Sequence, residues 1–365
     1  MAKKLEEEYG TKVLMNVPEV DQVDLSAFSE GKAKETRRFH ESIPAYNRTP
    51  MVQLRGLGGK LGVKGIFVKN EAERFGMKAF KGLGGTYAMF RILCRELGLD
   101  PGKVDFSEFQ KADVREKTAK YTFVTATDGN HGKGVSWASG LFGAHAYVYM
   151  PKGTVKAREE AVRQAGPAEV TVTDWNYDDT VKYAKKMSEE HGWFLIQDTS
   201  WDGYEEIPGW IMDGYLTMAS EAAEQTEAAG EIPTHVFLQA VAGYLVNHYG
   251  EKAPKIMIVE PDVADCIFRS GEAGELCSVD GAPETIMAGL NCGTPCKSIW
   301  PVLKSVPAAY ITCKDYAAAH AMRAYAKPAG DDPVIVSGES GASTMGAVLM
   351  LLERPELEAA RKALG

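Results

Sequence analysis

One lysine stands where its amine could do covalent chemistry. Lys81 follows Phe80 and precedes a glycine cluster in residues 73–88, ERFGMKAFKGLGGTYA. A helical pattern opens soon after it, and a cation is poorly placed there because the positive end of the helix dipole lies at the helix start. One interpretation of Lys81 is an amine held in a dry pocket, with a lowered pKa, ready to form a Schiff base. The alternative, which this loop taken alone favours, is a surface lysine at a helix start. We interpret Lys78 as an ordinary solvated residue.

A second group of polar residues follows an apolar run in residues 125–134, TATDGNHGKG. Asp128 and Asn130 can form a tight turn around Gly129, and the glycine lets backbone N–H groups approach a ligand. Such N–H groups at a helix start bind a carboxylate or phosphate. The alternative is a helix cap from Asp128 or Asn130, but a cap leaves His131 unexplained.

A third acidic loop occupies residues 195–215, LIQDTSWDGYEEIPGWIMDGY. Asp198 closes an apolar run, and we weigh a catalytic carboxylate evenly against a helix cap at this position. For Asp202, Glu205 and Glu206 a solvated helix face is the better interpretation. Three nearby aromatic residues could wall a pocket: Trp201, Tyr204 and Trp210.

Short β-branched runs alternate with helical stretches along most of the chain. The strand candidates are residues 65–69, 121–126, 145–150, 169–173, 193–197, 234–239, 255–260, 308–313 and 333–338. This alternation predicts βαβ units and mostly parallel sheets. Nine strands exceed one comfortable sheet, so we expect two sheets, with the strands near 121–197 in one compact domain. Ligands in such folds bind beyond the carboxyl ends of the strands, where the three loops lie.

The composition is that of a folded globular protein, with 45% apolar and 25% charged residues among 365. At roughly 150 residues per domain, this length favours two domains or one large α/β unit. The formal net charge of −9 makes nucleic acid a poor partner. No apolar run reaches the ~18 residues of a membrane helix, and the charged N-terminus lacks a signal segment, so we expect a cytoplasmic protein without membrane contact.

Four of the six cysteines fall in one stretch: Cys266, Cys277, Cys292 and Cys296. They lack paired C-x-x-C spacing and have no nearby histidine, so we expect no metal site. Reduced thiols are the simplest interpretation, and one cross-link among the four stays open.

Glycine motifs exclude the commonest phosphate loops. Residues 56–62, GLGGKLG, lack the dinucleotide-binding spacing and are interpreted as a turn and helix start. No GxxxxGK[ST] and no GxSxG motif occurs. By contrast, residues 337–343, SGESGAS, follow a predicted strand and could face a ligand.

In combination, these loops resemble a known family. Lysine in F-K-x-x-G-G, followed by D-G-N-H after the next strand, resembles the fold-type II enzymes that use pyridoxal 5′-phosphate (PLP). The full loop strings, with YNRTPMVQL at 46–54, are similar to the diaminopropionate ammonia-lyase family. The resemblance implies an α/β fold with two domains, each with a mostly parallel sheet flanked by helices, and the cofactor in the cleft between them. The large PLP-binding domain would comprise residues 1–88 and 227–365, and the small domain residues 89–226.

The resemblance also implies roles for individual residues. Lys81 would hold PLP, Asn130 would hydrogen-bond its phenolic oxygen, and Asp128 and Asp198 would remove the substrate α-proton from opposite faces. Implied cofactor contacts are Phe80, Gly243, Ser337 and Glu339, and implied substrate contacts are Thr127, Gly129 and His131.

The implied activity is elimination of ammonia from D- and L-2,3-diaminopropionate, giving pyruvate and a second ammonia, in a homodimeric enzyme of amino-acid catabolism. The main rival is a serine or threonine dehydratase-type PLP lyase, which predicts a neutral residue at Asp128. A non-catalytic binding homologue is a further alternative. A nicotinamide dehydrogenase is a distant third, because no GxGxxG motif follows a strand.

The sequence departs from the family pattern in three places. The glycine-rich phosphate loop is shortened to Gly243 within residues 239–250, and the chain ends before the family's last strand and tail. Asn70-Glu71-Ala72 replaces the more usual Asp-Glu-Ser. Either a short glycine-rich piece is missing from this sequence or the protein has lost it. We favour the first, because the strand would otherwise run on without its loop and helix start.

Overall fold

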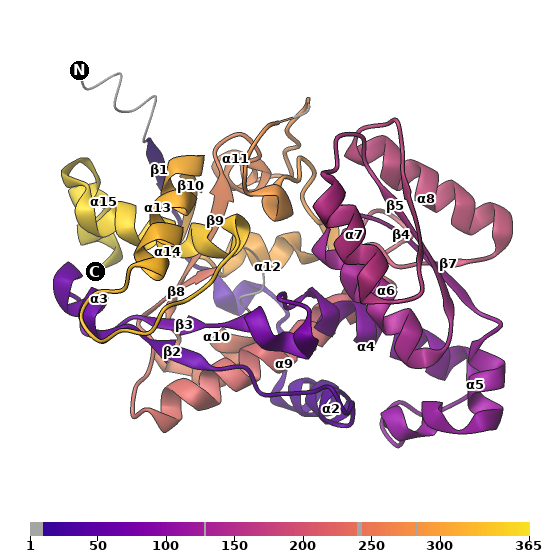
Figure 1. Ribbon diagram of the computed structural model, residues 1–365. Helices are drawn as coiled ribbons and strands as arrows, with labels where there is room; N and C mark the ends of the chain where they lie inside the picture. The colour runs from indigo at the N-terminus through magenta and orange to yellow at the C-terminus, as the bar shows by residue number, and fades with distance from the viewer. Residues whose placement is uncertain (1–9, 128, 239–242, 282) are drawn as a thin grey trace. The chain divides into compact units, whose positions relative to one another are not determined.

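Two compact units make up the chain in the computed structural model, which describes residues 10–127, 129–238, 243–281 and 283–365 (Figure 1). The first unit comprises Met1–Ser29, Pro50–Asn70 and Ala222–Gly365, and the second comprises Glu30–Thr49 and Glu71–Glu221. The predicted domains, residues 1–88 with 227–365 and residues 89–226, differ from these units chiefly at 30–49 and 71–88. Those two segments join the second unit because helix α4 (Lys81–Leu97) packs against helices α2 (Glu30–Glu41) and α6 (Asn130–Phe142) there.

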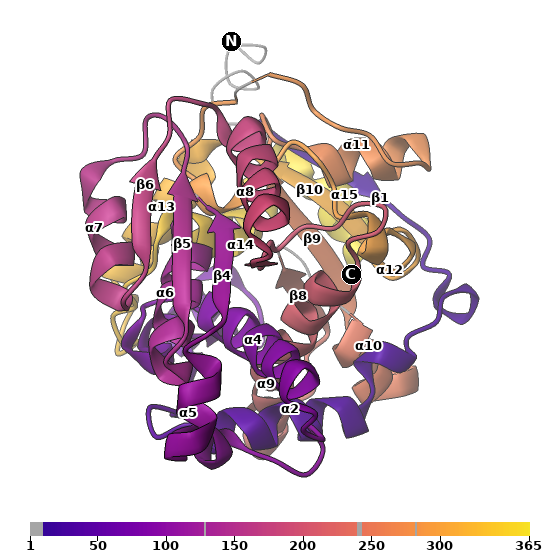
Figure 2. The same cartoon turned by 90° about the vertical axis from the view of Figure 1, so that its right-hand side faces the viewer.

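The second unit contains a four-stranded sheet in the order β6-β5-β4-β7, and all of its paired strands are parallel. The strands are β4 (Thr122–Ala126), β5 (His145–Met150), β6 (Glu169–Val172) and β7 (Phe194–Leu195). Helix α6 and α7 (Lys156–Ala165) cover one side of the sheet, and α8 (Tyr177–His191) covers the other (Figures 1 and 2). The central strands β4 and β5 are therefore mostly buried, as their near-continuous apolar runs predict, whereas the edge strand β6 is largely exposed.

The first unit contains a second four-stranded sheet, in the order β1-β10-β9-β8. Strands β8 (His235–Leu238), β9 (Lys255–Pro261) and β10 (Ala309–Cys313) are parallel, and β1 (Thr11–Met15) joins β10 in the antiparallel direction. Side chains from β9 and β10, such as Met257 and Ile311, pack with those of α13 (Asp315–Ala326) and α14 (Glu339–Glu353). The expected two mostly parallel sheets are thus confirmed.

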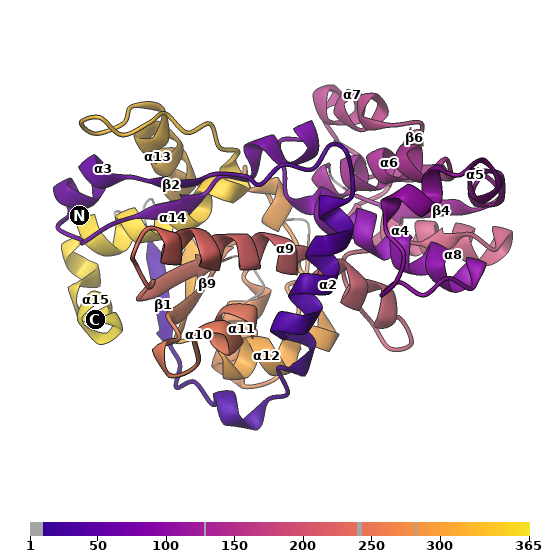
Figure 3. The same ribbon diagram turned by 90° about the horizontal axis from the view of Figure 1, so that it is seen from below.

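An antiparallel pair, β2 (Met51–Gln53) and β3 (Phe67–Lys69), also belongs to the first unit, and α3 (Arg55–Leu61) connects the two strands at one end of the pair (Figure 3). The remaining α-helices are α5 (Ala112–Thr118), α9 (Glu206–Ala228), α10 (Gly243–Tyr249), α11 (Cys266–Ala273), α12 (Trp300–Ser305) and α15 (Glu358–Leu364). Among the described residues, no helix combines the length and apolar character needed to cross a membrane.

Residues 333–338 were predicted as a strand, and this prediction is wrong. The segment pairs with no strand, and Val334 and Val336 are 60% and 80% exposed, whereas Ile335 is buried. The buried Ile335 anchors the segment to the core. A β-strand needs a neighbouring strand to pair with as well as an alternating pattern, and this segment has no such neighbour. Two short strands were not predicted from the sequence, β1 and β2. Each depends on pairing with another strand, β10 for β1 and β3 for β2.

Candidate active site

Helix α4 begins at Lys81 and is held against α6 by direct backbone contact. A Cβ atom added at Gly134 of α6 would lie 3.1 Å from the Cα of Gly82 and 3.1 Å from the carbonyl oxygen of Lys81. The two helices therefore touch where a side chain would separate them. This contact fixes the backbone that carries the Lys81 amine.

A second glycine contact holds α4 against α9. A Cβ atom at Gly214 would lie 2.6 Å from the carbonyl oxygen of Leu83 and 2.7 Å from the Cα of Gly84. One at Gly84 would lie 2.8 Å from the ring of Tyr215. The start of α4 is thus clamped on two sides by helices.

At the centre of the site, Lys81 and Asp198 form an ion pair. The Lys81 Nζ lies 2.5 Å from the Asp198 Oδ2, and the two side chains are 25% and 17% exposed. Asp198 follows the carboxyl end of β7 closely, the side of a strand at which ligands of such folds bind. A carboxylate at this distance stabilises the ammonium form of Lys81. The lowered pKa of Lys81 expected from the sequence stays a prediction.

Burial and charge oppose each other at Asp198. Burial disfavours the carboxylate and raises its pKa. The neighbouring His131, when it is charged, and the ammonium group of Lys81 oppose burial and hold the pKa of Asp198 well below its usual range. His131 could add to this effect only in its charged form, which its own burial opposes. Burial lowers the pKa of His131.

His131 is fixed by one of its two ring nitrogens. Its Nε2 lies 2.8 Å from the carbonyl oxygen of Ile196, while its Nδ1 has no hydrogen-bond partner and lies 3.7 Å from the Asp198 Oδ2. The side chain is 3% exposed. The side chain of His131 thus faces Asp198, and the substrate contact implied for His131 stays a prediction.

Tyr215 is a site residue that the sequence analysis did not single out. Its hydroxyl is buried without a hydrogen-bond partner, and its ring meets Phe80 edge-on at 5.0 Å between centroids. Burial raises the pKa of this phenol, Lys81 opposes the shift and Asp198 adds to it. Phe80, predicted as a cofactor contact, thus packs beside the Lys81–Asp198 pair. The only signal for Tyr215 was its place at the end of the acidic 195–215 loop.

A buried arginine anchors the segment before Lys81. Arg74 is fully buried; its Nε donates to Glu71 at 2.8 Å and its Nη2 donates to Glu221 at 2.7 Å. Residues Phe75 and Lys78 then adopt left-handed backbone angles, with φ of 51° and 56°, which non-glycine residues rarely take. The segment from Arg74 to Lys81 is thus tied down at its start. The sequence analysis missed Arg74, whose only signal was an arginine next to acidic residues in an apolar segment.

The 125–134 loop is organised by Thr127. Its Oγ1 accepts hydrogen bonds from the N–H groups of Gly129 at 3.0 Å and Gly132 at 3.2 Å. These two donors serve the turn, and the substrate contacts proposed for Thr127 and Gly129 stay predictions. Asn130 is exposed at the first position of α6. Asp128 lies outside the described residues.

Three predicted cofactor contacts belong to the first unit. Gly243 is buried at the start of α10, against the ring of Phe28. Glu339 begins α14, and the Ser337 hydroxyl donates to the carbonyl of Gly338 at 3.0 Å. Their role toward a cofactor stays a prediction, and residues 239–242 of the shortened loop lie outside the described residues.

The acidic and aromatic residues of the 195–215 loop divide into two groups. As expected, Asp202, Glu205 and Glu206 are exposed. Trp201 and Tyr204 stack on each other at 4.5 Å between centroids, and Arg91 lies over the ring of Trp210. That these rings wall a pocket stays a prediction.

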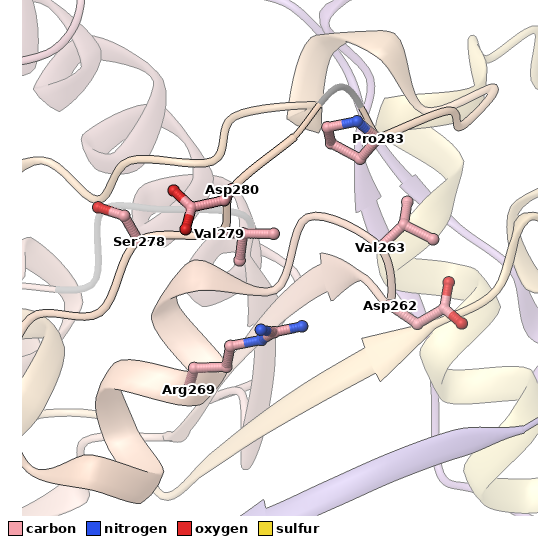
Figure 4. A pocket seen from close by; sticks show the side chains of 7 residues that line it. All are labelled: Asp262, Val263, Arg269, Ser278, Val279, Asp280 and Pro283. Atoms are coloured by element: carbon pink, nitrogen blue, oxygen red, sulfur yellow. The ribbon is translucent and has the colours of Figure 1, made fainter.

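The cysteines are free thiols, and the described residues contain no cluster of three metal-ligating side chains. A separate open pocket in the first unit is lined by Asp262, Val263, Arg269, Ser278, Val279, Asp280 and Pro283 (Figure 4). Its one arginine is paired with Asp265 at 2.7 Å. None of the residues predicted for the active site lines this pocket.

The model of the family described as "Pyridoxal-phosphate dependent enzyme" matches residues 43–364. The chain belongs to this family. Diaminopropionate ammonia-lyase of Escherichia coli K12 is 45% identical over 345 residues, which cover 92% of this chain and 85% of that protein. The Salmonella typhimurium LT2 enzyme of the same name is 44% identical, covering 90% of this chain and 84% of its own length.

Solved structures of relatives have the same fold. The Escherichia coli diaminopropionate ammonia-lyase in complex with D-serine matches with a TM-score of 0.89 and 41% identity, covering 98% of this chain and 90% of that chain. The complex of that enzyme with an aminoacrylate-PLP azomethine reaction intermediate matches with a TM-score of 0.87, covering 97% and 90%. The predicted fold-type II class and the resemblance to diaminopropionate ammonia-lyases are confirmed.

Proposed function

We propose that this protein is a PLP-dependent ammonia-lyase that converts 2,3-diaminopropionate and water to pyruvate and two molecules of ammonia. The observation that carries the proposal is the Lys81 amine at 2.5 Å from the partly buried Asp198 carboxylate, on a chain 45% identical to a diaminopropionate ammonia-lyase. The nucleophile and the base are thus already within reach of each other.

The described residues fit the cofactor chemically. Lys81 would hold PLP through its amine, and Asn130 at the start of α6 would hydrogen-bond the phenolic oxygen. Two buried polar atoms near Lys81, the Tyr215 hydroxyl and the His131 Nδ1, lack partners and so leave hydrogen-bonding capacity in the site. When bound, PLP supplies an electron sink for the charge that forms at the substrate Cα.

Asp198 is suited to act as a base once Lys81 is occupied. Its charge depends on the adjacent ammonium group, whereas its burial persists. When the Lys81 amine is engaged elsewhere, the carboxyl group loses the stabilising charge of that amine, and burial then raises its proton affinity. Asp198 would then take the α-proton from one face of the substrate, and general-base help of this kind is worth on the order of 10²–10⁴-fold.

We assign removal of the α-proton from the opposite face of the substrate to Asp128. Two carboxylates on two faces would let one enzyme act on both D- and L-2,3-diaminopropionate. Carboxylates also suit the second ammonium group of this substrate, which serine lacks. The leaving β-nitrogen needs a proton, and Lys81 is the candidate donor. The product 2-aminoacrylate is then released, and water converts it to pyruvate and ammonia.

The test is product formation by purified protein loaded with PLP. We expect both isomers of 2,3-diaminopropionate to give two ammonia per pyruvate and serine to give none. Lys81→Ala should abolish turnover, and Lys78→Gln, at an exposed lysine nearby, should keep it. Pyruvate from serine alone would favour a dehydratase-type lyase. No product from any of these substrates would favour a binding homologue that has lost the phosphate loop.

The homodimer and the cytoplasmic location expected from the sequence remain predictions. Each chain has a mass of 39.7 kDa, so light scattering on the purified protein should report twice that mass if the dimer forms.

A further inference from the structure

The hydrogen bonds of His131 determine where its ring carries a proton. The carbonyl oxygen of Ile196 can only accept, so the Nε2 at 2.8 Å must be the donor. In the neutral ring, the Nδ1 then holds a bare lone pair. This lone pair has no hydrogen-bond partner and faces the Asp198 Oδ2 at 3.7 Å.

A lone pair beside a carboxylate is an unfavourable contact, because neither group has a proton to donate. The contact is tolerated in the structure while Lys81 binds the same Oδ2 at 2.5 Å. Once Asp198 gains a proton, the contact changes sign, since the acid O–H can donate to the Nδ1. A shift of about 1 Å would bring the two atoms to normal hydrogen-bond distance.

We propose that His131 is a positioning residue for Asp198. The His131 Nδ1 accepts a hydrogen bond from the O–H group that Asp198 forms when it takes the proton from the substrate. The inference rests on the proposed function. The Cα–H bond breaks, its proton forms the O–H bond of Asp198, and the electron pair stays on the substrate carbon. The His131 ring gains no proton. Its Nε2–H keeps its hydrogen bond to the carbonyl oxygen of Ile196, and its Nδ1 only accepts a hydrogen bond. His131 thereby favours the protonated acid and strengthens Asp198 as a base.

His131→Gln tests this role, because a glutamine can replace the Nε2 donor to Ile196 but places no acceptor at the Nδ1 position. Asp198→Asn is measured first, and the isomer whose turnover it abolishes is taken as the one that depends on Asp198. We expect His131→Gln to lower kcat for that isomer about tenfold or more and to leave the other isomer within about twofold. His191→Gln, at an exposed histidine in the same unit, should change neither rate.

Equal loss for both isomers would indicate a general structural role and overturn the proposal, as would no loss for either. If the wild-type protein turns over neither isomer, the proposed function fails, and the role of His131 fails with it. A defect confined to the other isomer would also contradict the proposal.

A second measurement needs neither turnover nor the cofactor. In protein labelled with ¹⁵N-histidine, the His131 signals are those that His131→Gln removes, or are assigned through their coupling to neighbours if this variant does not fold. We expect a protonated Nε2 and an unprotonated Nδ1 at neutral pH. A proton on the Nδ1 would overturn the proposal, because the nitrogen could not then accept one from Asp198.

Discussion

Burial and charge act in opposite directions on the carboxyl group of Asp198, and its neighbours decide the outcome. At an effective dielectric constant of about 20, unit charges at the observed separation attract by roughly 7 kcal/mol, whereas burying one ion costs several. The Lys81 ammonium group therefore keeps Asp198 ionised. This dependence on one neighbour makes the base adjustable, because engaging Lys81 removes the stabilising charge.

Tyr215 gives a residue-scale prediction about stability. Its buried hydroxyl has no partner, and an unsatisfied buried group costs about 1–3 kcal/mol. Tyr215→Phe should therefore raise the unfolding free energy of the cofactor-free protein by about 1 kcal/mol, as measured by urea denaturation.

The matched comparison is Tyr204→Phe in the same unit. The Tyr204 hydroxyl donates to the carbonyl of Leu195 at 2.9 Å and accepts from the N–H of Gln197 at 2.8 Å. Its removal should destabilise the protein by about 1–3 kcal/mol. Equal destabilisation by both variants would show that the Tyr215 hydroxyl is satisfied after all.

Residue types and spacing predicted Lys81, Asp198 and His131 because each lies in a short loop or helix start after a strand. They could not predict that Lys81 and Asp198 form an ion pair, since the pairing depends on how far each loop turns. Tyr215 and Arg74 gave almost no local signal. Their importance comes from neighbours distant in sequence, such as Glu221 for Arg74.

At the scale of elements, glycine contacts decide how closely α4 can approach α9. Gly214→Ala would place a methyl group 2.6 Å from the Leu83 carbonyl oxygen. This oxygen belongs to the backbone of α4 and cannot easily move away. We expect a loss of about 1–3 kcal/mol in unfolding free energy and a displaced Lys81 with reduced activity.

Gly209 on the same helix is the control for this substitution. No atom lies within 4 Å of a Cβ added there, so Gly209→Ala should stabilise the helix by up to about 1 kcal/mol through propensity alone. If Gly214→Ala also stabilised the protein, the close approach of α4 and α9 would be contradicted.

Strand patterns predicted the interior strands of both sheets well, because buried parallel strands are strongly apolar. They failed at the sheet margins. Residues 333–338 have the alternation of a strand but no neighbour to pair with, whereas β1 is weakly patterned and owes its existence to the exposed edge of β10. Pairing partners far apart in the chain are set by the tertiary fold, which a local pattern does not contain.

At the scale of the whole molecule, each compact unit is assembled from separate chain segments, so its stability reports on many elements at once. His40 illustrates this in the second unit, where its ring joins Thr217 on α9 to the Leu83 carbonyl on α4. The ring is fully buried, and burial lowers its pKa to about 3.

This shift predicts how stability depends on pH. Between about pH 6.5 and pH 3 the unfolded state binds a proton at His40 that the folded state does not, so stability falls as the pH falls. The slope from one such proton is about 1.4 kcal/mol per pH unit. His40→Gln should reduce this acid slope by that amount in urea unfolding measured from pH 7 to pH 4.

His191→Gln, at an exposed position, should keep the wild-type slope. Because the chain has two units, the transition of the second unit must be followed by a probe located there, such as the fluorescence of its tryptophans. An unchanged slope in His40→Gln would contradict a buried, neutral His40.

The most direct test of the account is to locate the lysine that holds the cofactor. Borohydride reduction of the PLP-loaded protein fixes the cofactor permanently on that lysine, and peptide mass spectrometry then identifies it. The account predicts the reduced pyridoxyl phosphate group on Lys81. Attachment to Lys78 or Lys133, or no attachment in protein that still turns over 2,3-diaminopropionate, would contradict it.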